Sequence, residues 1–401
     1  MILLLVCMVA ERYPPHIGGA PFCIHQLSSA LVRLGHHVHV VTGSEPETPR
    51  EEVIDGVQVF RVGRSGVPRL RSLTFVHEAT RKLFNLSKEH GYDLVHCHNG
   101  VGGLIGYRWR RAFEKPYIVT LHGSIATSMK AGYLVRTLAR LIEEFSVKNA
   151  DAATFDGRSL LTDFLASTGM ERRKAFYIPN AVDPEVFSPQ SDAKSNVGIN
   201  PDSTNVTYVG RLVPGKGLLT LLDAFSQAWS NMSGLSLIIV GDGPYLRVME
   251  EDLRRRNPNP SVSFLGAISH NELPRIYAAS HMVVLPSISE GLSRSLLEAM
   301  ACEKPVIATG IPANLSLVQD GENGLIVPLG STELLAEAIL RLAKDKNLQR
   351  RLGRAARKTI LREYVVDKRV ERMLDAYRVA LESFQDGKRA ASLRGGFSQG
   401  E

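Results

Sequence analysis

The sequence has little cysteine and no long apolar run. Four cysteines occur in 401 residues, too few for a disulfide scaffold, and no two of them form a CxxC pair. Scarce, unpaired cysteine is typical of a reducing compartment, so we expect a cytoplasmic protein. The first apolar run ends at residue 10, far short of the ~20 residues that span a bilayer, and no basic segment precedes it as in a secretory signal.

An excess of acidic residues is also absent, and the basic excess is unevenly distributed. The formal net charge is +7. Residues 1–180 contain 22 Lys and Arg against 16 Asp and Glu, whereas residues 181–401 contain 26 against 25. A basic first half favours an anionic partner such as a membrane surface or a phosphorylated substrate, and we expect no nucleic acid. The alternative is charge that serves solubility only.

Short apolar runs alternate with amphipathic stretches along most of the chain, which predicts βαβ units and a parallel sheet buried on both faces. The alternation is interrupted by polar residues 188–203, which read as a linker. We therefore predict an α/β protein with two doubly wound Rossmann-like domains, at 1–187 and 204–365. The default ligand site of such a pair is the cleft that both domains face.

The segment 286–301 (PSISEGLSRSLLEAMA) carries two glutamates around the start of a predicted helix. Glu290 follows a strand and a serine-rich turn, and Glu298 lies eight residues further along. The carboxylates can accept hydrogen bonds from sugar hydroxyls, and the free N–H groups at the helix start favour phosphate oxygens. The segment therefore suits a ligand that is both polyhydroxylated and phosphorylated. The alternative is a plain helix-start carboxylate and a surface glutamate. The backbone that would meet the phosphates at this helix start belongs to Gly291, Leu292 and Ser293.

A glycine-rich basic turn follows the first strand of the second domain. Arg211 and Lys216 place two cations beside a helix start, which suits a diphosphate. Gly210 and Lys216 fit the P-loop pattern, but Gly217 replaces the Ser or Thr that would bind Mg²⁺. The chain also lacks any Asp-x-Asp pair. We therefore expect the two cations to neutralise the phosphates without a metal or another cofactor; the alternative is a solvated basic turn.

In the first half, glycine and histidine follow predicted strands. At Gly18 and Gly19, positive φ angles would let backbone N–H groups approach a phosphate; the alternative is a plain tight turn. His122 stands at a strand end, where an imidazole can hydrogen-bond a sugar hydroxyl. His96 and His98 share a strand face, and a zinc site that joins them to His122 is a further alternative.

These residues, in this order, resemble the retaining glycosyltransferases of family 4, which have the GT-B fold. The resemblance covers about residues 1–365 and is most specific at the E-x7-E motif of Glu290 and Glu298. It includes the Thr-Leu-His-Gly segment around His122. It also includes residues 178–187, which look like the end of the family's first domain.

In the second domain, the resemblance implies that Arg211 and Lys216 neutralise the diphosphate of the donor, in the turn that Gly210 opens. Glu290 would orient the donor sugar, and Glu298 would hold the ribose. The nucleotide base would meet the backbone near Gly266 and Ile268.

In the first domain, the resemblance implies that His122 contacts the donor sugar near the reacting centre. Gly18 and Gly19 would form the loop between the phosphates and the acceptor. The GT-B fold also implies a helix at 366–387 that crosses back to the first domain, and we expect a flexible tail at 388–401.

The implied function is that of a retaining, metal-independent hexosyltransferase with a nucleotide-diphosphate sugar as donor and a glycan or lipid-linked acceptor. A nucleotide-sugar epimerase or a glycan phosphorylase of the same fold is an alternative, and so is a non-catalytic nucleotide-sugar binder. A dehydrogenase would depend on Gly241-Asp-Gly243 alone, which is too little for a dinucleotide fingerprint.

Two stretches, 68–88 and 129–145, mix basic with apolar residues. In the second, Leu134, Leu138 and Leu141 recur at helical spacing. Such a surface can rest on anionic lipid at the cytoplasmic face of a membrane, which would favour a lipid-linked acceptor. The alternative is a helix packed on a sheet.

Overall fold

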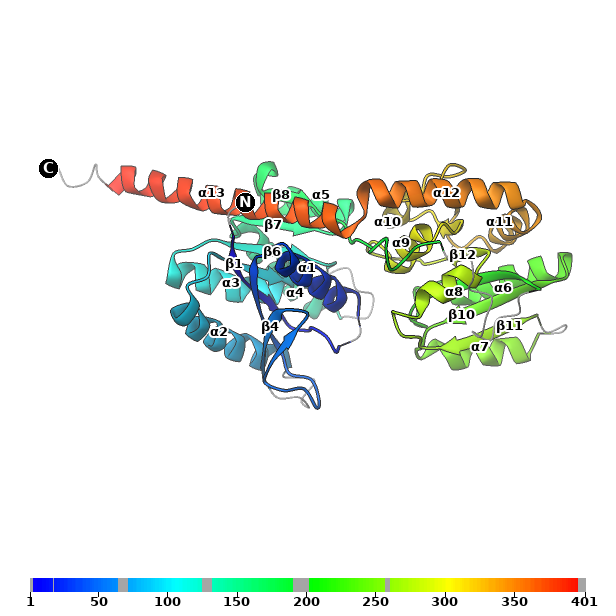
Figure 1. Ribbon diagram of the computed structural model, residues 1–401, viewed down its shortest axis with the longest axis horizontal. Coiled ribbons are helices and arrows are strands. Elements are labelled where there is room, and N and C mark those ends of the chain that lie inside the picture. Colours follow the sequence, from blue (N-terminus) through cyan, green and yellow to red (C-terminus); the bar gives the residue numbers. More distant parts are fainter. Residues whose placement is uncertain are drawn as a thin grey trace. The chain divides into compact units, whose positions relative to one another are not determined.

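A computed structural model of the chain describes residues 3–16, 18–63, 71–124, 132–189, 202–256 and 260–395. The chain forms two units, the first from residues 1–179 and 366–401 and the second from residues 180–365. Each unit is built on one sheet with helices on its faces (Figure 1). Among the described residues, no helix is long and apolar enough to cross a bilayer.

The sheet of the first unit has the strand order β3-β4-β2-β1-β5-β6-β7-β8, and only β3 and β4 pair in antiparallel fashion. The strands β5 and β6 are buried along their whole length, as expected for parallel strands covered on both faces. The strands are Leu5–Ala10 (β1), His37–Gly43 (β2), Glu51–Ile54 (β3), Val57–Val62 (β4), Leu94–His98 (β5), Tyr117–Leu121 (β6), Ala152–Phe155 (β7) and Ala175–Tyr177 (β8). The helices are Gly19–Arg33 (α1), Arg71–His90 (α2), Asn99–Phe113 (α3), Tyr133–Lys148 (α4), Arg158–Thr168 (α5) and the short Arg172–Lys174 (η2).

The C-terminal helix α13 (Val366–Gly395) belongs to the first unit, as the fold implied. Its Met373 and Tyr377 are buried in a core that also contains residues of β1, β2 and α1. The flexible tail predicted from residue 388 starts too early, because the helix continues to Gly395. The physical reason is that residues after Gln385 include no proline, and one glycine costs a helix only about 1 kcal/mol.

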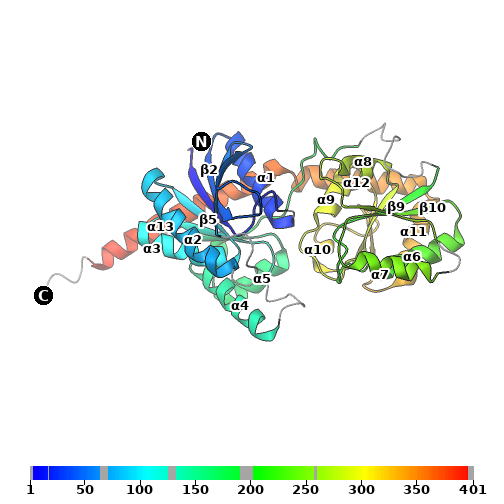
Figure 2. The same ribbon diagram turned by 90° about the horizontal axis from the view of Figure 1, so that it is seen from below.

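The sheet of the second unit is parallel throughout, with the strand order β11-β10-β9-β12-β13-β14. Figure 2 shows α6 and α7 on one side of it and α8, α9 and α12 on the other. The strands are Thr204–Val209 (β9), Leu235–Val240 (β10), Val262–Gly266 (β11), Met282–Leu285 (β12), Val306–Thr309 (β13) and Leu325–Val327 (β14). The helices are Leu218–Asn231 (α6), Tyr245–Arg254 (α7), Leu273–Ala279 (α8), Arg294–Ala301 (α9), Pro312–Leu315 (α10), Thr332–Lys344 (α11) and Lys346–Glu363 (α12).

The border between the units differs from the prediction, which ended the first domain at residue 187. Residues 180–187 belong to the second unit. Val182 pairs with Val365, and Phe187 is buried in the second core beside Tyr277. Residues 180–187 join the second unit because these apolar side chains are buried in its core. Residues 190–201 of the predicted linker lie outside the described residues.

In each sheet the strand order reverses at one point, which is where doubly wound folds bind ligands at the carboxyl ends of strands. In the first unit this point lies between β1 and β5, and in the second between β9 and β12. The loops after β9 and β12 are the two segments that the sequence predicts to bind a donor.

Three glycines in the loops after β9 and β10 stand where the backbone leaves no room for a side chain. A Cβ atom on Gly241 would lie 1.9 Å from the carbonyl oxygen of Gly210, and one on Gly243 would lie 2.2 Å from that of Leu212. A Cβ atom on Gly217 would lie 1.9 Å from the carbonyl oxygen of Pro286. The Gly241-Asp-Gly243 motif therefore supports the loop after β9. That loop also donates a hydrogen bond to the motif, from the N–H of Leu212 to the carbonyl oxygen of Asp242 at 2.8 Å.

The substitution Gly241→Ala should lower the free energy of unfolding by about 3 kcal/mol or more, because β9 and β10 would have to separate. Gly234→Ala is the matched control, since Gly234 has a φ of +83° but a Cβ there would meet nothing within 4 Å. The control should lose only the ~1 kcal/mol of a left-handed backbone. Urea unfolding of both variants measures the difference, and equal losses would contradict the close approach.

Candidate active site

The loops after β9 and β12 are fastened to each other. The N–H of Ile288 donates to the carbonyl oxygen of Gly215 at 2.8 Å, and the carbonyl of Pro286 faces Gly217. Gly217 has a φ of +66° and precedes α6, so the chain turns directly from this loop into the helix. The structure therefore brings the predicted diphosphate turn and the predicted glutamate turn to one place.

Lys216 and Glu290 form an ion pair across these two loops. The Lys216 side chain is 18% exposed and that of Glu290 is 12% exposed, so water screens the pair only in part. The Ser287 hydroxyl also donates to Oε1 of Glu290, at 2.8 Å. Among the described residues, both contacts use Oε1, and Oε2 has no hydrogen-bond partner. Glu290 thus keeps one oxygen for a hydroxyl group.

Arg211 is exposed, and its guanidinium has no hydrogen-bond or ion-pair partner in the described part of the chain. Its positive charge acts on the Tyr208 hydroxyl, whose pKa is raised mainly by burial and lowered by Arg211. The turn thus carries one paired cation and one unpaired cation. A dianionic ligand at this position would find a positive charge that no carboxylate neutralises.

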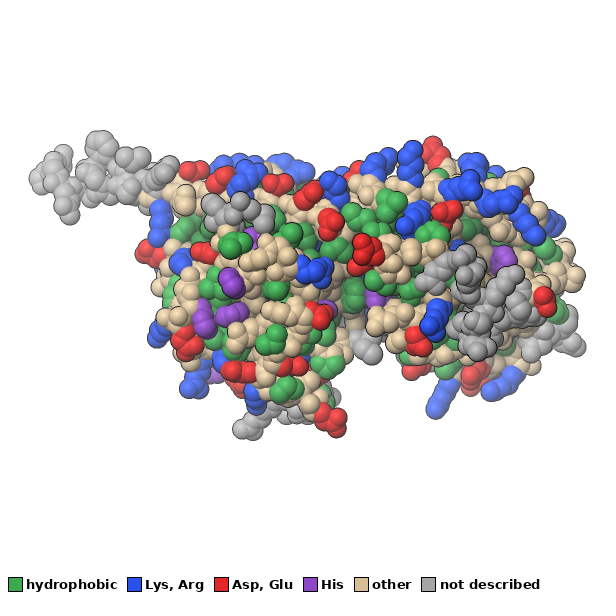
Figure 3. Space-filling view, viewed as in Figure 1, with side chains coloured by type: hydrophobic (Ala, Val, Ile, Leu, Met, Phe, Trp, Pro, Cys, Tyr) green, Lys and Arg blue, Asp and Glu red, His purple; other side chains and the backbone are tan. Residues whose placement is uncertain are grey.

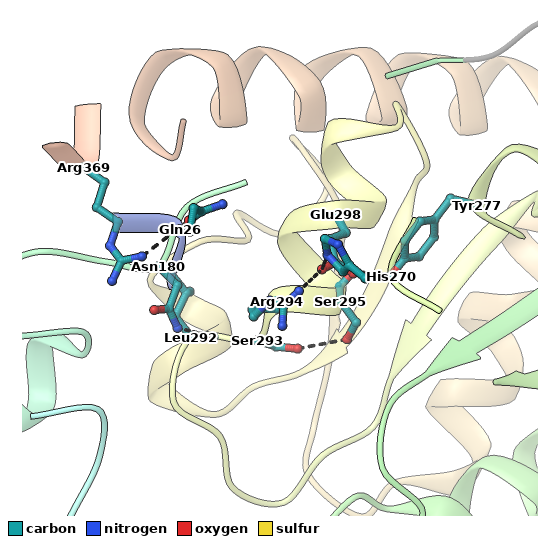
Figure 4. A network of polar contacts seen from close by, with 10 residues as sticks. All are labelled: Gln26, Asn180, His270, Tyr277, Leu292, Ser293, Arg294, Ser295, Glu298 and Arg369. Carbon is teal, nitrogen blue, oxygen red and sulfur yellow. Dashed lines mark hydrogen bonds and ion pairs between the residues drawn. The ribbon is translucent and has the colours of Figure 1, made fainter. Parts of the chain in front are cut away.

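Glu298 is buried, and both of its carboxylate oxygens accept hydrogen bonds. The alternative interpretation of Glu298 as a surface residue is therefore wrong. Its Oε1 accepts from Nε2 of His270 at 3.1 Å and from Nη2 of Arg294 at 3.0 Å, and its Oε2 accepts from the Tyr277 hydroxyl at 3.0 Å (Figure 4). Burial and the Glu298 charge raise the pKa of Tyr277 well above its usual value. The carboxylate therefore holds three donors in place around the start of α9.

Sequence reasoning missed His270, Tyr277 and Arg294. Arg294 precedes Glu298 by four residues on a helix, a spacing that predicts an ion pair. His270 and Tyr277 come from a distant segment before and within α8, so no local pattern reveals them.

The first turn of α9 has no side-chain cap. Ser293 is the N-cap residue, but its hydroxyl contacts the Ser295 hydroxyl at 3.0 Å instead of a backbone N–H (Figure 4). Leu292 is buried, and its carbonyl oxygen accepts from Nδ2 of Asn180 at 3.2 Å, whereas Gly291 is exposed. A helix start without a side-chain cap favours an anion, as the sequence predicted.

Gly266 and Ile268 lie at the carboxyl end of β11, two strands away from β9. Gly266 has a φ of +68° and accepts a hydrogen bond from the N–H of Gly241 at 2.7 Å. Ile268 is half-buried against the core. The same edge of the sheet thus presents this turn and the Arg211 turn, and the contact with a base stays a prediction.

In the first unit, the positive φ angles predicted for Gly18 and Gly19 are wrong. Gly18 is the N-cap of α1 with a φ of 176°, an extended conformation, and Gly19 begins the helix. Gly18 itself is extended where it precedes α1, so neither glycine needs a left-handed conformation. A Cβ atom on Gly19 would meet nothing within 4 Å, so the glycine leaves open space at the start of the helix.

His122 lies after β6 in a buried cluster of polar groups and is 6% exposed. Its Nε2 is 3.1 Å from Nδ1 of His98, and its Nδ1 is 3.9 Å from Oδ2 of Asp156. Burial and the Arg369 charge lower the pKa of His122 to about 3, so the imidazole is neutral. Both ring nitrogens face protein groups, and contact with a donor sugar stays a prediction.

His96 shares this cluster but has its own partners. Its Nδ1 is 2.8 Å from the hydroxyl of Tyr377 on α13, and its Nε2 is 2.6 Å from the Thr120 hydroxyl. Arg369, also on α13, donates to the Cys23 carbonyl oxygen at 2.9 Å. Among the described residues, no group of three His, Cys, Asp or Glu side chains is arranged to hold a metal ion, which disfavours the zinc interpretation.

Family comparisons agree with this arrangement of two doubly wound units. A family model described as glycosyltransferase family 4 matches residues 17–186, and one described as glycosyl transferases group 1 matches residues 189–359. The chain belongs to the family 4-like glycosyltransferases of the GT-B fold.

This glycosyltransferase has similar relatives in several bacteria. It is 29% identical to the UDP-Gal:alpha-D-GlcNAc-diphosphoundecaprenol alpha-1,3-galactosyltransferase of Escherichia coli, over 74% of this chain and 77% of the relative. It is 25% identical to the GDP-mannose-dependent alpha-(1-6)-phosphatidylinositol monomannoside mannosyltransferase of Mycobacterium tuberculosis, over 93% and 98%. Its fold matches the sucrose-phosphate synthase of Thermosynechococcus elongatus with a TM-score of 0.82 and 25% identity, over 94% and 98%.

The buried Asp156 carboxyl should make the folding stability of the glycosyltransferase depend on pH. Burial raises its pKa from 3.8 to about 7, although Arg369 opposes the rise. A group whose pKa is raised on folding binds more protons in the folded state, so its contribution to stability is present below about pH 4 and is lost as the pH rises to about 7.

The Asp156→Asn variant lacks this loss. Relative to the wild type, its free energy of unfolding should therefore increase between about pH 4 and 7, by up to ~4 kcal/mol. His96, His98 and His122 titrate in both proteins, so their effect cancels in the difference. Urea unfolding across this pH range gives the comparison, and parallel profiles for the two proteins would show that Asp156 ionises freely.

Proposed function

We propose that this glycosyltransferase moves a hexose from a nucleotide-diphosphate sugar to a glycan or lipid-linked acceptor, with retention of the anomeric configuration and without a metal. One observation carries the proposal. At the switch point of the second sheet, an unpaired Arg211 and the Lys216–Glu290 pair stand beside an α9 start that no side chain caps. This set of groups suits a ligand with two phosphates and a hydroxylated sugar.

The two cations, Arg211 and Lys216, stabilise the negative charge that develops on the diphosphate leaving group. Cleavage of the anomeric bond gives the sugar positive character and leaves negative charge on the diphosphate. Fixed cations beside the departing phosphate favour that transition state. Arg211 can bind a phosphate oxygen without giving up another contact, whereas Lys216 exchanges its contact with Glu290 for a phosphate oxygen.

Glu290 then orients the donor sugar through Oε2, and Glu298 holds the ribose, with His270 and Arg294 fixing its carboxylate. Retention requires either a covalent carboxylate intermediate or attack on the same face, assisted by the leaving group. We favour same-face attack, because Glu290 is the one carboxylate on these two loops and we assign its available oxygen, Oε2, to the hydroxyls of the donor sugar.

A membrane setting for the acceptor is supported by two observations. The names of the two bacterial relatives specify an undecaprenol-linked and a phosphatidylinositol-linked acceptor. In α4, Tyr133, Leu134 and Leu138 are 79%, 80% and 60% exposed. We therefore propose peripheral association at the cytoplasmic face of a membrane. The described side chains of α2, at residues 74–90, contribute no exposed apolar face to it, because Phe75 and Leu83 are buried in the core.

The first experiment is a thermal-shift screen with UDP-, GDP- and ADP-sugars in the presence of EDTA. A donor at 100 times its dissociation constant should raise the stability by about 2.7 kcal/mol.

Arg211→Gln should weaken binding of that donor roughly 10- to 100-fold, because it removes a charge-assisted hydrogen bond. Arg254→Gln, an exposed change on α7, is the control and should bind as the wild type does. A shift that disappears with EDTA would refute the metal-independent part.

The second experiment follows the bound donor with and without acceptors. Transfer should produce a glycoside with the anomeric configuration of the donor, which NMR coupling constants reveal. An inverted product would exclude retention. Conversion of the donor with no acceptor present would favour the epimerase, and an absorption band of pyridoxal phosphate would favour the phosphorylase.

A further inference from the structure

The helix α12 presents a solvent-facing side that is almost wholly cationic. Every exposed position of this helix except two is Lys or Arg, and no carboxylate lies among them. Figure 3 shows Lys and Arg side chains gathered over α12 and the end of α11. The exposed cations of α12 are Lys346, Arg350, Arg351, Arg354, Lys358 and Arg362, and the other two exposed residues are Asn347 and Leu361.

The second unit neutralises few of these charges. Arg354 is 3.7 Å from Glu303 and 75% exposed, and Arg362 is 3.4 Å from Glu363 and 68% exposed, so water screens both pairs. Lys346 and Lys358 have no ion-pair or hydrogen-bond partner within the described residues.

The arrangement is unfavourable for the helix itself. Lys346, Arg350, Arg354, Lys358 and Arg362 follow one another at intervals of four residues, and each like-charged pair at this spacing destabilises a helix by about 0.2–0.5 kcal/mol. Lys346 also stands in the first turn, where the helix dipole repels a cation. A row of charges that costs stability, and whose two carboxylate contacts are screened by water, points to an anionic partner outside the chain.

We propose that the exposed side of α12 binds an anionic lipid surface. Eighteen residues of helix span about 27 Å, and the exposed cations are distributed along this length, so the helix can meet several lipid headgroups at once. Leu361 is the one large apolar side chain on it, so the helix lies on the headgroups and does not insert. The strip has no aromatic side chain on which a nucleobase would stack, which disfavours single-stranded nucleic acid.

This contact rests on the proposed membrane setting of the acceptor, but it is measured without donor or acceptor. The experiment is flotation of the full-length protein with vesicles of phosphatidylcholine alone or of equimolar phosphatidylcholine and phosphatidylglycerol. The wild type should float with the anionic vesicles at low salt and be released at high salt, since salt screens such attraction.

The test variant is Arg350→Gln/Arg354→Gln/Lys358→Gln. Each cation near an anionic surface strengthens binding about fivefold, so this variant should bind roughly 100-fold more weakly. Arg247→Gln/Arg254→Gln/Arg255→Gln removes the same charge from the α7 segment on the opposite side of the sheet (Figure 2), and it should float as the wild type does. Thermal unfolding of both variants at or above the wild-type temperature excludes a folding defect, and the α12 variant should gain slightly because like-charged pairs are removed.

Three results would overturn the proposal. They are failure of the wild type to float with anionic vesicles at low salt, equal flotation of the α12 variant, and tighter binding of the wild type to a single-stranded RNA than to the vesicles. Donor binding by the wild type in the thermal-shift screen shows separately whether the proposed transfer activity stands.

Discussion

The close approach of backbone segments at the carboxyl ends of β9, β10 and β12 is the constraint on which the candidate site depends. Carbonyl oxygens of Gly210 and Pro286 occupy the space where Gly241 and Gly217 would carry side chains. Because the loops are in contact, the donors and acceptors on them keep fixed relative positions. Preorganised groups of this kind stabilise developing charge without reorganisation during the reaction.

On this support, the two glutamates of the family motif have different surroundings. Glu290 is partly exposed and shares one oxygen with Lys216 and Ser287, which leaves its other oxygen for a ligand. Glu298 is buried, and both of its oxygens accept hydrogen bonds. The first glutamate therefore has one oxygen without a partner in the described part of the chain, which can contact the donor sugar, and the second has a carboxylate fixed in one orientation by three donors, as the proposed ribose contact requires.

The first unit depends on buried polar contacts that the C-terminal helix completes. Tyr377 of α13 contacts His96. Burial and the Arg369 charge together lower the pKa of His122, and the same charge opposes the rise that burial causes in the pKa of Asp156. Buried polar groups are costly unless they are paired, so α13 is part of this unit and not an appendage. The position of His122 after β6 is thereby linked to residues almost 250 positions later in the chain.

The sequence by itself determined the two doubly wound units and the loops that carry Arg211, Lys216 and Glu290. These follow from local apolar periodicity and from short motifs, which depend on neighbouring residues. The return of the last helix to the first unit was implied by the resemblance to the GT-B fold. Only the tertiary structure decided that Phe187 packs with the second unit, that Glu298 is enclosed by His270 and Tyr277, and that Gly18 is extended. Each of these depends on which distant surfaces become buried together, and that choice is made by the packing of the whole unit.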